Sequence, residues 1–257
     1  MTVRRRTAGF AAFLVYLGCA LSVAQADQRY RVDGRDTYQI GGHDVRSEIA
    51  YSGFGTLRIE QKGRYRKYTA HVEYDRNDQG TLARSKASFE STISDGGEQV
   101  DGRNRDPDYL TVLNQPFAVQ LDAPTLRDLS RLHGTVPFDF PSPMTGAPLH
   151  GTLRHIGDAV INGIRVLGVA FDASGPLHGS LPDHPAISLA GRIRMSGTAY
   201  YTYGNALLLA LDATLSIGGN LDDTGAHAPV SIVYKRTIRA ASPSPLGDAQ
   251  VGAKTAR

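Results

Sequence analysis

The chain has 257 residues, with 28 Lys and Arg, 25 Asp and Glu, one cysteine and no tryptophan. The single cysteine, Cys19, excludes an intramolecular disulfide and a cysteine-based zinc site. Arg4, Arg5 and Arg6 account for the net charge of +3, because no acidic residue precedes Asp27 and the remaining residues balance. This balance gives no support for nucleic-acid binding.

The first 26 residues have the pattern of an export signal. Three arginines precede an uncharged stretch over 7–26, which ends in Ala24-Gln25-Ala26. A basic start, an apolar centre and a small-residue A-x-A ending are typical of a secretory signal peptide, here cleaved after Ala26. We therefore expect an exported protein, periplasmic or secreted, by a route that stays open. A retained membrane anchor is the alternative, since the apolar stretch is nearly long enough to span a bilayer.

Apolar and polar residues alternate with a period of two along most of the remaining chain. This period is typical of antiparallel strands with one buried and one solvated face. The second half is more apolar on both faces, and we expect about ten to twelve strands, more than a flat open sheet holds comfortably. The clearest stretches are 57–60, 68–74, 87–93, 117–121, 193–203, 207–217 and 230–234.

Two local patterns add a turn and a helix to these strands. Asn162-Gly163 lies between two apolar segments and is the strongest hairpin signal, a type I′ turn. Residues 122–134 predict one short helix, because Asp122 can cap it, Gly134 can end it, and three leucines form an apolar ridge. The predicted fold class is all-β and mainly antiparallel: a curved sheet, either a half-barrel (clam) or a sandwich, with one short helix.

The prolines between the helix and the second half suggest a break in the organisation. We expect one β-rich domain over 27–240, with a candidate half-domain boundary near 137–148. The tail from 241 to 257 has no apolar periodicity and is predicted to be disordered.

No residue pattern predicts catalysis. Asp172 ends an apolar run, as does the active-site aspartate of retroviral-type aspartic proteases, but Asp172-Ala173-Ser174-Gly175 is one residue too long for their motif. We interpret Asp172 as the end of a strand, followed by a turn. His178 and His184 flank a proline-containing loop, a spacing that does not predict zinc. We expect no metal site, no cofactor and no catalytic residue.

One stretch combines basic and aromatic side chains. Residues 58–76 contain Arg64, Arg66 and Lys67 together with three tyrosines. This composition can bind nucleic acid, but an exported protein rarely meets any, so we expect no nucleic-acid partner. The stretch is either a solvated strand face or a surface for anionic lipid headgroups or envelope polysaccharide.

The layout resembles two bacterial groups: exported β-rich proteins of unknown function, and the LolA/LolB-like lipoprotein carriers. The Asn162-Gly163 hairpin, the stripes 193–203 and 207–217, and the helix at 122–134 carry the resemblance. The resemblance to the carriers implies a half-barrel around a short helix that holds a lipid. The candidate ligand-binding residues are Leu126, Leu129, Met195, Tyr201, Tyr203, Leu207, Leu209 and Leu211.

We therefore expect a non-enzymatic envelope protein that binds a lipid or other apolar ligand in a β-sheet cavity. Two packed sheets without a cavity are a structural alternative. The functional alternatives are an outer-membrane β-barrel, with Tyr200, Tyr201 and Tyr203 in an aromatic girdle, and an exported hydrolase without a recognisable motif. The oligomeric state is not predicted.

Overall fold

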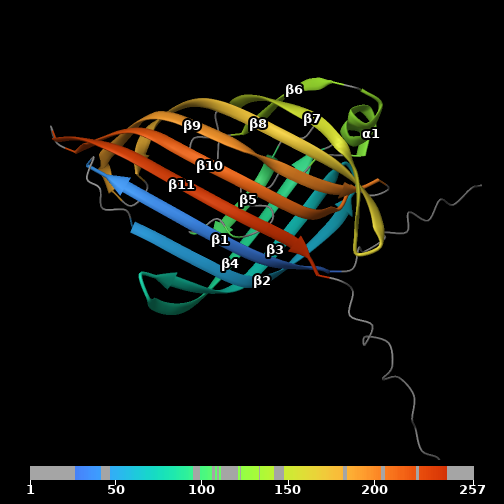
Figure 1. Cartoon of the computed structure of the whole chain (residues 1–257), viewed down its shortest axis with the longest axis horizontal. Helices are drawn as coiled ribbons and strands as arrows, with labels where there is room; N and C mark the ends of the chain where they lie inside the picture. Colours follow the sequence, from blue (N-terminus) through green and yellow to red (C-terminus); the bar gives the residue numbers. More distant parts are fainter. Residues whose placement is uncertain are drawn as a thin grey trace, which may run out of the picture.

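A computed structural model shows one antiparallel sheet of eleven strands and one short helix (Figure 1). The sheet is strongly curved but not closed into a barrel, which confirms the predicted fold class. The structure describes residues 27–41, 47–94, 99–105, 108, 110, 121, 123–132, 134–141, 148–181, 184–203, 206–223 and 226–241.

The number of strands agrees with the periodicity of the sequence, and the helix lies within the predicted range 122–134. The strands are long because apolar and polar residues alternate along them. In chain order the elements are β1 Gln28–Ile40, β2 Ser47–Lys62, β3 Tyr65–Asp78, β4 Thr81–Ser94, β5 Gln99–Arg105, α1 Ala123–Arg131, β6 Thr135–Pro141, β7 Pro148–Ile161, β8 Ile164–Leu181, β9 His184–Thr202, β10 Leu208–Asp223 and β11 Ala226–Ala240.

The first and last strands meet in the middle of the sheet. The spatial order is β5-β4-β3-β2-β1-β11-β10-β9-β8-β7-β6. β1 pairs with β11 from Tyr30 opposite Ala240 to Ile40 opposite Val230. The two edge strands, β5 and β6, follow one another along the chain with α1 between them, so the open seam of the sheet lies between them.

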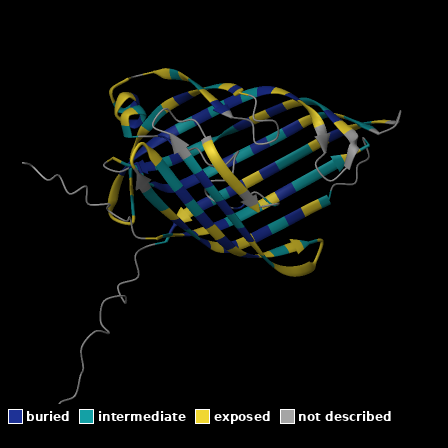
Figure 2. Cartoon of the chain, turned by 180° about the vertical axis from the view of Figure 1, so that it is seen from behind, coloured by how far each residue is buried: buried dark blue, intermediate teal, exposed yellow. Residues whose placement is uncertain are grey.

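The two faces of the sheet differ as the alternation predicts. Along β1, Tyr30 and Val32 are buried while Arg31 is exposed. Figure 2 shows this as buried and exposed bands that alternate along each strand. Because a curved single sheet encloses only its concave side, the buried positions form the concave face.

One end of the sheet, called here the α1 end, holds the helix and the β7–β8 hairpin (Figure 1). The hairpin turns at Asn162 and Gly163, whose φ angles of 51° and 76° confirm the predicted type of turn. The Asn162 side chain donates a 3.2 Å hydrogen bond to the carbonyl of Ala240 in β11. Since β9 and β10 lie between β8 and β11, the hairpin crosses the ends of both strands. Val166 of β8 and Ala210 of β10, near this end of their strands, are buried.

The interpretation of Asp172 as a strand end is wrong. β8 continues to Leu181, and Asp172 lies within it opposite Ser196 of β9. Its carboxylate accepts a 2.7 Å hydrogen bond from Arg194 Nη2, and both side chains are largely exposed. The strand continues because Ala173 and Gly175 are small enough for the concave face. They pair there with Met195 and Ile193 of β9.

Some predictions concern residues that the structure does not describe. The leader 1–26, the tail beyond Ala241 and the strand predicted at 117–121, apart from Leu121, lie outside the described residues. Within the described part of the chain, no helix is long and apolar enough to cross a membrane.

Prolines protect the β6 edge from further pairing. Pro137 and Pro141 are an even number of residues apart in β6, so their backbone nitrogens point to the same side. β6 pairs with β7 on one side only. A proline in an edge strand turns the position of its missing N–H away from the neighbouring strand. The free edge of β6 therefore lacks donors at both positions, which disfavours edge-to-edge association.

We expect the double variant Pro137→Val/Pro141→Val to self-associate, because both positions then offer a donor to a second strand. Size-exclusion chromatography with light scattering would show species larger than those of the parent protein. A matched change in an internal strand, Pro229→Val in β11, should leave the mass unchanged, because Asn220 of β10 and Gly41, next to β1, lie on its two sides. An unchanged mass for the double variant would contradict this account of the edge.

Candidate functional site on the concave face

The concave face of β6 to β10 is apolar. Phe171 lies opposite Gly197, and the next level places Ala173 opposite Met195, which in turn lies opposite Leu215. Each of these large side chains is at most 3% exposed, and burying one contributes roughly 1.5–3 kcal/mol. The apolar half, as we call this surface, comprises Phe138, Phe140, Leu149, Leu153, Val169, Phe171, Ile193, Met195, Leu211, Leu215 and Ile217.

Aromatic rings continue the apolar half to the open seam. The rings of Phe138 and Phe140 in β6 meet edge to face with centroids 4.7 Å apart. The Phe140 ring is 6.1 Å from that of Phe171 in β8. Phe138 is only half-buried, so it is the aromatic side chain of this group that lies closest to solvent.

The concave face of β1 to β3 is different, because it carries tyrosines. Tyr30, Tyr51, Tyr68 and Tyr74 are each at most 3% exposed. The Tyr30 hydroxyl donates a 2.8 Å hydrogen bond to the carbonyl of Leu208, which ties β1 to β10 across β11. Phenol rings add apolar area and also supply a hydroxyl donor, so this half of the interior is amphipathic.

A buried ion pair lies at the centre of the tyrosine half. Asp36 of β1 and Arg236 of β11 contact each other through both guanidinium nitrogens, and both side chains are 0% exposed. Arg236 Nη1 also donates to the carbonyl of Lys235 at 2.8 Å. The guanidinium carbon lies 5.1 Å from the Tyr51 ring centroid and 5.8 Å from that of Tyr234. Such a charge is tolerated inside the protein because it is paired, hydrogen-bonded and stacked on rings.

Gly34 makes room for this arginine. It lies opposite Arg236 in the β1–β11 register, and a Cβ atom at position 34 would be 3.0 Å from Arg236 Cδ. A side chain at this position would therefore crowd the Arg236 side chain.

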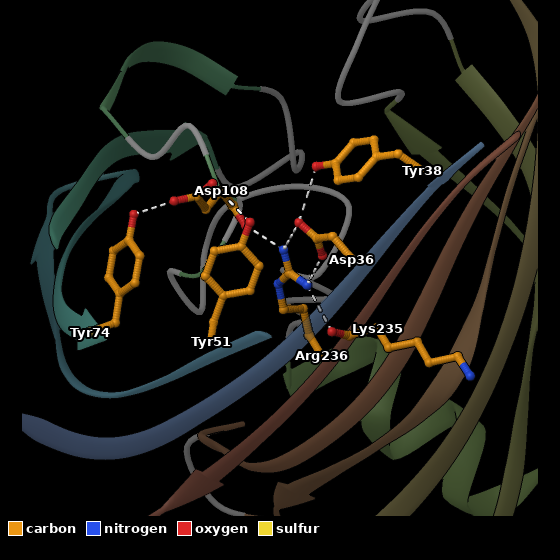
Figure 3. A network of polar contacts seen from close by, with 7 residues as sticks. All are labelled: Asp36, Tyr38, Tyr51, Tyr74, Asp108, Lys235 and Arg236. Carbon is orange, nitrogen blue, oxygen red and sulfur yellow. Dashed lines mark hydrogen bonds and ion pairs between the residues drawn. The ribbon is translucent and has the colours of Figure 1, made fainter. Parts of the chain in front are cut away.

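The ion pair is linked to a residue between β5 and α1. Asp108 accepts hydrogen bonds from the hydroxyls of Tyr51, at 3.1 Å, and Tyr74. Its own carbonyl accepts one from Arg236 Nη2. Figure 3 shows these side chains converging from β1, β2, β3 and β11 on Asp108 and Arg236. The polar network, as we call it, attaches the connection after β5 to the concave face.

Burial keeps two tyrosine hydroxyls next to Asp36 protonated, those of Tyr51 and of Tyr38, whose hydroxyl donates a 3.3 Å hydrogen bond to Asp36. It raises the pKa of Tyr51 and of Tyr38, and the neighbouring carboxylate of Asp36 adds to both shifts. Burial also raises the pKa of Asp36, whereas the Arg236 guanidinium opposes that shift. The hydroxyls of Tyr51 and Tyr38 therefore stay protonated and can donate hydrogen bonds.

Other described parts of the connection also lie inside the curve. Leu110 and Leu121 are 1% and 3% exposed. Burial raises the pKa of Tyr201, and the backbone of Leu121 lies close enough to its hydroxyl to oppose that shift. Asp108 thus contacts the tyrosine half, and Leu121 lies close to Tyr201 near the end of β9.

The described residues show no metal-binding cluster. Among them, no group of three or more His, Cys, Asp or Glu could hold a metal ion. One polar pocket of about 410 Å³ lies at the β3–β4 turn, away from the α1 end, and is lined by Arg76, Asp78, Gln79, Thr81 and Ala83. The feature that dominates the interior is therefore its division into an apolar half and a tyrosine half.

The structure brings most of the predicted ligand-binding residues to the interior. Met195, Tyr201 and Leu211 are buried on the concave face, Leu209 is buried at an irregularity of the β10–β9 pairing, and Leu207 is half-buried. Leu126 and Leu129 form the buried side of α1.

Tyr203 is separate from these residues, because it lies at the rim and is 39% exposed. Its hydroxyl donates to Asp158, and its ring lies under the Arg165 guanidinium at 5.8 Å. Direct contact with a ligand stays a prediction for all eight residues.

Sequence reasoning missed the polar network. One signal was present. Asp36 is the next residue on the same face of the strand as Tyr30, Val32 and Gly34, where an apolar residue is expected. Arg236 likewise continues the stripe of Val230, Ile232 and Tyr234. A charge at a core position of each of two strands indicates a buried pair.

The comparisons with known proteins add little to this site. No protein-family model matches the chain, and no curated protein matches it. A solved structure described as "Lipid-protein interactions in lipovitellin" superposes with a TM-score of 0.43 and 9% sequence identity. The match covers 87% of this chain but 26% of the lipovitellin chain. A likeness this weak carries no argument, and the resemblance to LolA/LolB-like carriers is not shown.

Proposed function

We propose that this chain is an exported, non-enzymatic protein that binds a lipid or similar apolar ligand against the apolar half of its concave face. The observation that carries the proposal is the division of one concave surface into an apolar half and a tyrosine half. A packed core needs apolar side chains only, whereas an amphipathic ligand matches both kinds of surface.

Two further features support the proposal. The sheet is open between β5 and β6, so a ligand can approach the concave face without separating paired strands. The half-buried Phe138 lies at this seam and continues through Phe140 to Phe171, which provides a path of aromatic rings from solvent inwards. Export is proposed from the signal-like pattern of residues 1–26.

The absence of tryptophan from the chain allows a direct test. In Phe138→Trp, one indole would report on the seam of the apolar half. We expect a brominated fatty acid to quench most of its fluorescence with saturation, because bromine quenches only on contact. Unbrominated fatty acid should restore the signal by competition.

The matched control is Phe54→Trp. Phe54 is on the outer face of β2 and is 67% exposed, so its indole should not be quenched in a saturable way. Equal quenching of the two variants would indicate non-specific association and contradict the proposal. No saturable quenching in Phe138→Trp, with folding verified by circular dichroism, would also contradict it.

A further inference from the structure

The α1 end of the sheet gathers exposed basic side chains. The β2–β3 turn places Arg64 there, and α1 adds Arg127 and Arg131. All three are exposed, and within the described part of the chain none of them has an ion-pair partner. Arg64 belongs to the basic and aromatic stretch 58–76, so the fold brings that stretch to the same end as the helix.

Exposed apolar side chains lie at the same end. Val160 and Ile164 at the tip of the β7–β8 hairpin are 71% and 45% exposed. Leu132, next to α1, is 49% exposed, and Tyr65, the first residue of β3, is 46% exposed. Several exposed apolar groups on one rim indicate an interaction surface more strongly than single exposed residues do.

The hairpin tip is held in place at this rim. The Asn162 side chain bonds to the carbonyl of Ala240, and Arg165 Nε bonds to Asp158 at 2.9 Å. The Tyr203 hydroxyl donates to the same Asp158. Val160 and Ile164 are therefore exposed on an anchored element, so presenting them to a partner costs little conformational entropy.

Three acidic groups at the opposite end have partners. Asp78 at the β3–β4 turn contacts Arg76 at 3.2 Å, Asp139 of β6 contacts His150 at 2.9 Å, and Asp222 of β10 contacts His227. Arg64, Arg127 and Arg131 thus lie on the rim that also exposes Val160 and Ile164, and the exposed Asp128 of α1 offsets one of these three charges.

We infer that the α1 end is a docking surface for an anionic lipid bilayer. Aliphatic tips can enter the region between headgroups and acyl chains, tyrosines favour the same depth, and arginines pair with anionic headgroups. A soluble polyanion would match the arginines but not Val160 and Ile164. The inference does not depend on the proposed ligand, because docking uses the rim and ligand binding uses the concave face.

Vesicle flotation tests the inference. The chain should begin at Asp27, since every described element lies within 27–241 and the apolar leader would itself bind vesicles. We expect this protein to float with vesicles of equal parts phosphatidylglycerol and phosphatidylcholine, and much less with phosphatidylcholine alone. Arg127→Gln/Arg131→Gln should lower the partition coefficient by roughly fivefold for each arginine removed. Val160→Ser/Ile164→Ser should lower it severalfold.

Two matched controls replace exposed apolar residues elsewhere. Leu82→Ser lies near the opposite end on a residue that is 73% exposed, and Phe54→Ser lies on the outer face at 67%. Both should bind vesicles like the parent. Loss of binding in a control but not in Val160→Ser/Ile164→Ser would overturn the inference. So would failure of the parent to bind anionic vesicles, including the case in which it binds an anionic polysaccharide instead.

Discussion

Replacing Arg236 by methionine is expected to lower the free energy of unfolding by about 3–5 kcal/mol. The change leaves the Asp36 carboxylate without its partner at a position where its side chain is 0% exposed. It also removes the hydrogen bond to the Asp108 carbonyl and the stacking on Tyr51. Urea unfolding monitored by circular dichroism would measure the loss, provided that the variant and the parent have the same m-value.

A double variant separates the cost of an unpaired charge from the value of the pair. Asp36→Leu/Arg236→Met replaces both charges by apolar groups, and we expect it to be more stable than Arg236→Met alone. If the double variant were less stable than the single one by the full additive amount, the two residues would not be coupled. The buried pair would then not be the source of the effect.

The second large effect is expected at Gly197, where valine should lower the free energy of unfolding by about 3 kcal/mol. Gly197 faces the concave side of β9 under the Phe171 ring. A Cβ atom there would be 2.7 Å from Phe171 Cζ and would also meet the carbonyl oxygen of Asp212. The backbone of β10 cannot move away without breaking its pairing, so the strain is not relieved.

Gly218 provides the matched control. It is in β10 on the exposed side, and no atom lies within 4 Å of its expected Cβ position. Gly218→Val should change the free energy of unfolding by less than about 0.5 kcal/mol, as for ordinary surface substitutions. Thermal unfolding of the two variants would reveal the difference. Similar midpoints would contradict the expected clash between a side chain at position 197 and Phe171.

The polar network also bears on ligand binding. Tyr51, Tyr74 and Arg236 all contact Asp108, so the connection after β5 is attached to the concave face at that point. A variant that weakens this attachment changes the interior as well as stability. Stability and fatty-acid quenching should therefore be measured together in any variant of the network.

The sequence by itself determined the elements of this fold. Period-two alternation was sufficient to predict long antiparallel strands and their number, because each strand buries one face and exposes the other. Asn162-Gly163 predicted its hairpin, since these residues accept the positive φ angles that the turn needs. The three leucines between 122 and 134 predicted the helix that buries Leu126 and Leu129.

Only the tertiary structure decided which strands are neighbours. Asp36 and Arg236 are 200 residues apart and meet because β1 pairs with β11. Periodicity reports that a residue faces the core, but it does not report the residue opposite. The same limit explains Asp172, which looked like a strand end until pairing with β9 showed that β8 continues. The gathering of Arg64, Arg127 and Val160 at one rim likewise depends on the pairing of all the strands between them.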